Sequence, residues 1–292
     1  MSRILVTGIT SPLGQAVGKK LQAEGNRVVG TLRSSRISAA GLPADELVAL
    51  DLEDRSSFTN INGGFDAFVH AAAASEGTAE ELMTITGLGT LHLVERAKFL
   101  SVGRIIHISS MAVYGHINDA TVSEKTQINQ STPYGAAKWA AECYLNNESK
   151  IVNAVSIRSP AIAGNRTHRH FLAKILSRMS RGAPSILASN PEHMFNNLVH
   201  EDKIAEFVNS ILRANSLRPF QAFPIASIEP LPLREIVERL AKETAYKGEI
   251  IWKAADSPPF NIDSSAAIKI GYEPLATQAT LDLWMRDFKM SR

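Results

Sequence analysis

The strongest constraint on the fold is the alternation of short apolar runs with longer helical patterns through the first half of the chain. The runs are continuous rather than alternating, which is typical of parallel strands buried on both faces of a sheet. Expected strands are Arg3–Thr7, Arg27–Leu32, Leu47–Leu50, Asp66–His70, Arg104–Ile108 and Asn153–Arg158, and expected helices are Leu13–Glu24, Glu80–Ser101 and Tyr134–Ser149. This order predicts an α/β fold with a doubly wound parallel sheet.

Beyond Arg158 the regular alternation of strand-like and helix-like segments ends, because Pro and Gly residues interrupt it. Helical patterns return at Glu201–Ala214, Pro232–Thr244 and Leu275–Phe288, with Pro-rich separators at Arg218–Pro224 and Ser257–Phe260. We therefore predict two domains. The sheet domain covers 1–160 with contributions from about 195–226, and a smaller, mostly helical domain covers 161–194 and 227–292.

Composition narrows the class of protein. With 45% hydrophobic and 21% charged residues the chain has an ordinary globular composition. The net charge is only +2 and no long basic run occurs, so a small molecule is a better expected partner than nucleic acid. The single Cys143 excludes an intrachain disulfide, and neither a signal peptide nor a membrane-spanning run is found. We expect a cytoplasmic protein without membrane association.

A glycine-containing turn, Thr7–Gly14, follows the first expected strand and opens the first expected helix. Glycines in this context let the backbone approach a pyrophosphate and aim helix N-terminal amides at it. Gly8 and Gly14 have the spacing of the outer glycines of TGxxGxxG, and Ser11 at the middle position can cap the helix. Candidate cofactor contacts are Gly8, Thr10, Ser11, Pro12, Leu13 and Gly14. Alone, the pattern also fits a tight turn with no ligand.

A second motif joins Ser109-Ser110 at the end of the fifth strand to Tyr134 and Lys138, which lie four residues apart and share one helix face. A tyrosine hydroxyl, with a pKa of about 10, is a poor acid or base at neutral pH, but a lysine ammonium one turn away stabilises the phenolate. Ser110 could then hydrogen-bond the reacting oxygen. A lone Tyr-x-x-x-Lys is usually an ordinary amphipathic helix; its combination with the glycine turn favours a catalytic site.

With these motifs the chain resembles the extended short-chain dehydrogenase/reductase superfamily, in its NAD(P)-dependent epimerase/dehydratase family, which mostly acts on nucleotide sugars. The resemblance covers nearly the whole chain. It is carried by the glycine turn, Asp51-Leu52, Ala71-Ala72-Ala73, the SSMAVYG and PYGAAK segments, Arg158-Ser159-Pro160, the NLVHED segment Asn197–Asp202 and the helix after Gly271–Pro274.

The resemblance implies a catalytic triad of Ser110, Tyr134 and Lys138, with Ser110 preferred over Ser109 because it lies five residues before Gly115. Tyr134 would move a proton on a sugar or alcohol oxygen while hydride passes between carbon and nicotinamide, and Lys138 would also hold the nicotinamide ribose. Asp51 and Leu52 would border the adenine, and Ala71, Ala72 and Ala73 would lie along the cofactor. Related enzymes commonly form homodimers, so a homodimer is expected.

Two departures from the family pattern bear on the reaction. Thr86 stands where many members carry Asn, which puts a proton relay through that Asn in doubt. Met111 and Ala112 stand where the dehydratases place an Asp-Glu pair, so the acid and base for 4,6-dehydration are missing.

Cations suggest where phosphates would bind. Arg33 follows the second strand, where a cation accommodates a 2′-phosphate, so NADP(H) is favoured over NAD(H). Arg166 and Arg169 lie in a compact cationic stretch suited to the diphosphate of a nucleotide sugar. In each case the alternative is that the arginines are only solvated surface charges and bind no phosphate. His168 and His170 form a His-x-His pair, but no third ligand is identifiable, so no metal is expected.

Ser110, Met111, Arg166, Arg169 and Asn197 are the candidate substrate contacts. The leading hypothesis is an enzyme acting on a nucleotide sugar, either a 4-keto-sugar reductase or a 4-epimerase. Arg33 tilts the choice toward reduction, since a reductase consumes NADPH whereas an epimerase keeps its nicotinamide bound. An NADPH-dependent reductase of a non-nucleotide carbonyl and a non-catalytic NADP(H)-binding sensor or scaffold remain as alternatives.

Overall fold

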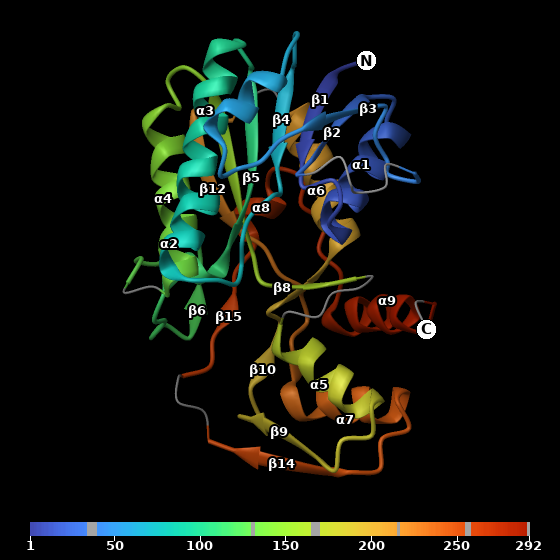
Figure 1. Ribbon diagram of the computed structural model, residues 1–292. Coiled ribbons are helices and arrows are strands. Elements are labelled where there is room, and N and C mark those ends of the chain that lie inside the picture. Colours follow the sequence, from blue (N-terminus) through green and yellow to red (C-terminus); the bar gives the residue numbers. More distant parts are fainter. Residues whose placement is uncertain (34–39, 130–131, 165–169, 215–216, 255–257, 291–292) are drawn as a thin grey trace.

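A seven-stranded parallel sheet forms the upper half of the molecule in a computed structural model that describes residues 1–33, 40–129, 132–164, 170–214, 217–254 and 258–290 (Figure 1). The strands are β1 (Arg3–Thr7), β2 (Arg27–Leu32), β3 (Glu46–Ala49), β4 (Ala67–His70), β5 (Arg104–Ser110), β7 (Asn153–Ser159) and β12 (Phe220–Pro224). Their order is β12-β7-β5-β4-β1-β2-β3, so the chain winds outward from β1 in both directions. The predicted doubly wound α/β fold is confirmed.

Helices cover both faces of this sheet (Figure 1). Helices α1 (Pro12–Ala23) and α6 (Glu201–Arg213) lie on one face, and α3 (Gly89–Phe99) and α4 (Pro133–Asn147) lie on the other. Because successive strand side chains point to opposite faces, Val6 belongs to the first core and Leu5 to the second. Burial on both faces explains why the strands are continuously apolar.

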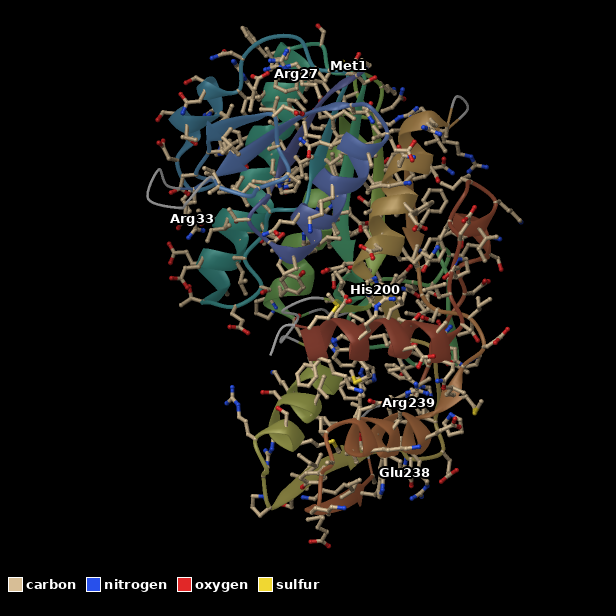
Figure 2. All side chains as sticks on the ribbon, turned by 90° about the vertical axis from the view of Figure 1, so that its right-hand side faces the viewer. Met1, Arg27, Arg33, His200, Glu238 and Arg239 are labelled. Atoms are coloured by element: carbon tan, nitrogen blue, oxygen red, sulfur yellow. The ribbon has the colours of Figure 1, made fainter. Side chains whose placement is uncertain are left out.

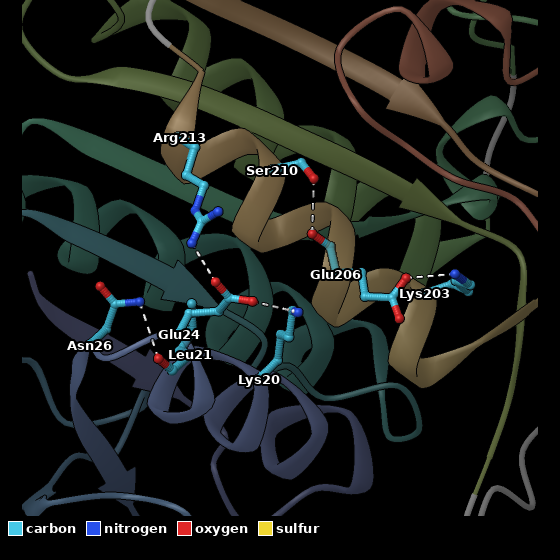
Figure 3. Close-up of polar contacts among 8 residues, drawn as sticks. All are labelled: Lys20, Leu21, Glu24, Asn26, Lys203, Glu206, Ser210 and Arg213. Carbon is cyan, nitrogen blue, oxygen red and sulfur yellow. Dashed lines mark hydrogen bonds and ion pairs between the residues drawn. The ribbon is translucent and has the colours of Figure 1, made fainter.

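Helix α6 comes late in the chain but packs beside α1, and polar contacts tie the two together (Figure 3). Arg213 of α6 pairs with Glu24 at the end of α1, and Glu24 also accepts a hydrogen bond from Lys20 at 2.7 Å. Exposed ion pairs of this kind contribute little stability. The apolar side chains beneath them, Phe207 and Val208 of α6 among them, supply most of the burial.

The predicted helix Glu80–Ser101 is not continuous. It starts as α2 (Ala79–Leu82), passes through a π-helical turn at Met83–Leu88 and continues as α3. Within that turn the Thr86 hydroxyl donates to the Ala74 carbonyl at 3.1 Å and accepts from the Ala74 amide at 3.2 Å. Such bulges occur frequently at functional sites, and this one holds the segment that follows β4.

The lower half of the molecule in Figure 1 joins short strand pairs to three helices, and we call this half the lobe. Strand β8 (Ala161–Ala163) pairs with β11 (Leu198–His200), β9 (Ser185–Ser189) with β14 (Glu249–Lys253), and β10 (Met194–Phe195) with β13 (Leu231–Pro232). Helices α5 (Phe171–Ser180), α7 (Leu233–Glu243) and α9 (Thr277–Met290) enclose an apolar core that includes Leu176, Leu240 and Trp284. The short pair β6 (Thr121–Val122) and β15 (Asn261–Ile262) and the short helix α8 (Ser265–Ile268) complete the chain.

Two local predictions were wrong. The Pro-rich Arg218–Pro224 stretch, expected to be a separator, contains β12, which pairs with β7 at the edge of the sheet; an edge strand tolerates proline at its ends. Helix α5 was missed, although His170 caps it by accepting from the Ala173 amide. The other predicted strands and helices begin and end within two residues of the observed ones, apart from the interrupted helix at α2 and α3.

The division into two domains stays a prediction. Among the described residues, no helix combines the length and the apolarity needed to cross a bilayer.

Candidate active site

The glycine turn brings backbone close to backbone at the carboxyl end of β1. Gly8 has a φ of 73°, in the left-handed region, and a Cβ there would lie 2.9 Å from the Ala72 amide nitrogen. Ser11 caps α1 by accepting from the Gly14 amide at 3.0 Å while its hydroxyl donates to the Gly8 carbonyl at 2.8 Å. A Cβ on Gly14 would collide with that same carbonyl. The tight cradle and the capped helix start suit a pyrophosphate.

A cavity of about 1400 Å³ opens between this turn and the lobe. It brings together residues from the turn between β1 and α1, the segment after β4, the end of β5, α4 and the segment before β11. Of the residues predicted from the sequence it is lined by Thr10, Ser11, Pro12, Leu13, Ala71, Ala73, Ser110, Met111, Tyr134, Lys138 and Asn197. Candidate cofactor, catalytic and substrate residues therefore share one site.

Other predicted residues lie outside the cavity lining. Gly8 and Gly14 form the packed turn beneath it, and the Ala72 amide donates to Thr7 Oγ1 at 3.1 Å. Asp51 Oδ1 accepts from the Glu53 amide, and Leu52 is buried against Gly89. Arg33 is exposed just after β2, at the margin of the sheet half (Figure 2). Arg36, Arg166, His168 and Arg169 lie outside the described residues.

The two serines at the end of β5 have different environments. Ser109 is buried and donates to Glu142 Oε1 at 2.5 Å, in a carboxylate that also pairs with Arg158 at 2.6 Å. Ser110 is half-buried, accepts from the Ala112 amide at 3.1 Å and lines the cavity. Both serines line the cavity, but the Ser109 hydroxyl is engaged by Glu142, whereas the Ser110 hydroxyl belongs to the more exposed side chain.

Tyr134 and Lys138 come from the first turns of α4, which begins at Pro133 and is capped by Thr132. Lys138 is 2% exposed, and its Nζ donates to the Ile108 carbonyl at 2.6 Å. Burial lowers the pKa of Lys138 to about 8, because the charged form loses its hydration. Tyr134 lies one turn away on the same helix face, so the ammonium is placed to stabilise its phenolate.

Two histidines beneath Lys138 were not identified from the sequence. His70 ends β4 and His107 lies within β5, and both are fully buried. His107 Nε2 is 3.4 Å from Lys138 Nζ. The available signal was a histidine in an otherwise apolar strand, but which residues it would face depends on the strand register.

The lobe side of the cavity includes a group of aromatic side chains. Phe171 and His193 each contact Phe195 edge-on, with ring centroids 5.6 and 5.9 Å apart. Burial lowers the pKa of His193, and that of His170 to about 4, so both rings are neutral at neutral pH. Lys174 of α5 is exposed and lines the cavity. Among the described lining residues, the cations are therefore Lys138 and Lys174.

The departures noted in the sequence have structural counterparts. Met111 is 9% exposed, and it and Ala112 place no acid or base after Ser110. Thr86 is fully buried, with its hydroxyl engaged by the Ala74 backbone. Within the described ranges, no group of three or more His, Cys, Asp or Glu side chains is placed to hold a metal ion.

Comparisons with known proteins identify the family and the fold. A family model described as the NAD dependent epimerase/dehydratase family matches residues 4–220. The chain is 26% identical over 315 residues to a UDP-glucose 4-epimerase of Streptomyces lividans, covering 97% of this chain and 95% of that protein. It is 22% identical over 246 residues to a 2-alkyl-3-oxoalkanoate reductase of Stenotrophomonas maltophilia, covering 82% and 74%. A UDP-glucose 4-epimerase structure with UDP-glucose from Thermotoga maritima has a TM-score of 0.84 at 21% identity, and the match covers 99% of both chains.

Proposed function

The chain belongs to the NAD dependent epimerase/dehydratase family, and we propose that it is an NAD(P)-dependent 4-keto-sugar reductase or 4-epimerase acting on a nucleotide sugar. The observation that carries this proposal is the convergence of Ser110, Tyr134 and Lys138 on one cavity whose floor is the glycine turn. The full-length similarity to UDP-glucose 4-epimerases supports the substrate class.

The residues have complementary chemical roles. When bound, the nicotinamide would supply or accept the hydride. The Ser110 hydroxyl donates a hydrogen bond to the sugar oxygen, and the Tyr134 hydroxyl transfers a proton to or from that oxygen. Lys138 keeps a positive charge one helical turn from Tyr134, which favours the phenolate. Because no acid–base pair follows Ser110, elimination of water is not part of the proposed reaction.

The proposed cofactor is NADP(H), bound over the glycine turn with Ala71 and Ala73 alongside it and Arg33 on its 2′-phosphate. Arg33 follows β2 on the edge of the sheet at which the glycine turn lies, and its side chain is exposed. Arg33→Ala should abolish the preference for NADPH over NADH, measured as the ratio of the two dissociation constants. An unchanged ratio would argue that Arg33 is only a surface charge.

The sugar nucleotide would extend toward the lobe. Asn197 lines the cavity, and its buried Oδ1 has no hydrogen-bond partner among the described residues, so it is available as an acceptor. Lys174 is the described lobe cation that reaches the cavity, and Arg166 and Arg169 remain proposed diphosphate contacts. Lys174→Ala should raise KM for the nucleotide sugar with little effect on kcat.

A second candidate is an NADPH-dependent reductase of a non-nucleotide carbonyl. The aromatic side chains around Phe195 and the single cation among the described lobe residues of the cavity would suit an apolar substrate. By its name, the 2-alkyl-3-oxoalkanoate reductase relative reduces an oxo group of a substrate that is not a nucleotide. A sensor that binds NADP(H) without turnover is the third reading.

The deciding experiment is hydride transfer from labelled NADPH across a panel of keto-sugar nucleotides and simple ketones. Label should appear in a sugar nucleotide with the wild type and be lost with Tyr134→Phe, while cofactor binding persists. Transfer only to simple ketones would favour the second candidate, and binding with no transfer would favour the sensor. Nicotinamide that co-purifies as NAD would favour epimerisation over reduction.

Association and location also remain proposals. We expect a cytoplasmic homodimer that packs through α4 and the α2–α3 region, where Trp139, Met83 and Leu88 are partly exposed. Light scattering of the wild type and of Trp139→Glu measures this directly.

A further inference from the structure

A row of four polar side chains crosses the centre of the sheet. Thr7 of β1 lies in register with His70 of β4, His70 with His107 of β5, and His107 with Ser156 of β7. All four are fully buried, and their neighbours in the middle of these strands are apolar. Buried polar groups are costly unless they are hydrogen-bonded, so their partners reveal what the row does.

The hydrogen bonds of His70 define its tautomer. Thr90 Oγ1 donates to the Thr86 carbonyl at 2.6 Å, so it must accept from His70 Nε2–H at 3.0 Å. His70 Nδ1 is then the acceptor for the Thr7 hydroxyl at 2.7 Å. Both nitrogens are satisfied by a neutral ring, and burial accordingly lowers the pKa of His70 to about 3.

His107 is neutral too, but it carries its proton on the other nitrogen. A lysine ammonium can only donate, so Lys138 Nζ, 3.4 Å away, makes His107 Nε2 an acceptor. The ring proton therefore lies on Nδ1 and is donated to Ser156 Oγ at 3.2 Å. The His107 ring stacks on His70, with centroids 5.7 Å apart and planes inclined by 24°, which holds it in place.

Lys138 thus has two of its three donors directed at fixed acceptors, the Ile108 carbonyl and His107 Nε2. Its side chain also lines the cavity. We infer that His107 is a positioning residue for Lys138: by accepting one N–H, it turns the third N–H into the cavity and supports the charged form of the amine. This inference rests on the catalytic role proposed above for Lys138.

The other charged groups around Lys138 do not obscure the influence of His107 on the Lys138 ammonium. Glu142, one turn further along α4, favours the ammonium but is itself engaged by Arg158 of β7. Tyr134 lies one turn earlier on α4, and the β4 and β5 strands present only the neutral rings of His70 and His107. Burial is the dominant influence and lowers the pKa of Lys138 to about 8, so a hydrogen bond to the ammonium has a measurable effect on its titration.

The test is a titration of Lys138 in the cofactor-free protein by NMR of 13C,15N-labelled lysine, with the Lys138 signal assigned from a Lys138→Met variant. His107→Phe keeps a planar ring but removes the acceptor, so the pKa of Lys138 should fall by about one to two pH units. His107→Gln, whose amide oxygen can accept from Nζ, should restore most of that shift. Thr90→Val is the matched control, because it removes an equally buried hydrogen bond, that between Thr90 and His70, which does not touch Lys138, and it should leave the titration unchanged.

Ring 15N shifts of the wild type test the same inference without any substitution. They should show a neutral Nδ1–H tautomer for His107 at neutral pH. An Nε2–H tautomer or a charged ring would overturn the inference, as would an unchanged Lys138 titration in His107→Phe. In assays of turnover, the alkaline limb of the kcat profile of His107→Phe should move to lower pH with KM little changed. Failure of the proposed reaction is distinguishable, because the cofactor-free titration does not depend on turnover.

Discussion

The two halves of the molecule differ in the charged side chains that they bury. The sheet half encloses Lys138, Glu142 and Arg158 together with the two histidines of the polar row. The lobe has an apolar core around Leu176, Leu240 and Trp284, and its buried His200 pairs with the partly exposed Asp287 of α9. The difference fits the proposed function. In that proposal Lys138 of the sheet half is a catalytic residue and must be held in a fixed position, whereas the lobe mainly keeps its wall of the cavity in place.

This comparison predicts that the sheet half is the more sensitive to the loss of a charge. Glu142 is fully buried and accepts from Arg158 and Ser109. Glu142→Gln keeps the volume but leaves a buried guanidinium without a counter-charge, which should lower the free energy of unfolding by about 3–5 kcal/mol. Urea denaturation at neutral pH measures the change.

The matched control is Glu24→Gln, which breaks the ion pairs of a partly exposed carboxylate with Lys20 and Arg213 (Figure 3). Solvent screens those pairs, so the unfolding midpoint should not move measurably. Equal effects of the two substitutions would mean that burial of the charge is not what distinguishes the sheet half.

The lobe should instead be sensitive to lost volume. Leu281 of α9 is fully buried in the apolar cluster beside Trp284. Leu281→Ala leaves a cavity there and should cost about 3 kcal/mol. Hydrogen exchange should show the loss of protection concentrated in α5, α7 and α9, with β1, β4 and β5 nearly unchanged. Equal loss of protection in the sheet would show that the two halves unfold as one unit.

The same contrast explains what could be predicted from the sequence. The strands of the sheet, the glycine turn and the pair Tyr134 and Lys138 are local signals, each contained within a few residues or one helix. The lobe is held by pairing between distant segments, such as Ser185–Ser189 with Glu249–Lys253, which no periodicity reveals. Burial patterns could not show the π-helical turn, because it depends on the contact between Thr86 and Ala74.

The candidate site was predictable to the same extent. Eleven predicted residues line the cavity, since the carboxyl ends of parallel strands meet at one edge. The role of His107 was not predictable, because it needs the register that aligns it with His70 and Ser156 and the helix placement that brings Lys138 above it.

Acid should weaken the sheet half through His70, and this is the smallest of the expected effects. The pKa of the buried ring falls from 6.5 to about 3, so between these values the unfolded chain binds a proton that the folded chain does not. Stability is therefore present above pH 6.5 and is lost as the pH falls, by about 2 kcal/mol for this ring at pH 5. Urea denaturation at pH 7 and pH 5 measures the loss.

The control is His70→Gln, whose amide can still form hydrogen bonds with Thr7 and Thr90. This variant should be less stable than the wild type at pH 7 but should lose less stability on acidification. An identical pH dependence would place the acid sensitivity elsewhere, first in His107, whose pKa burial also lowers, and then in His170 of the lobe, whose pKa burial lowers to about 4.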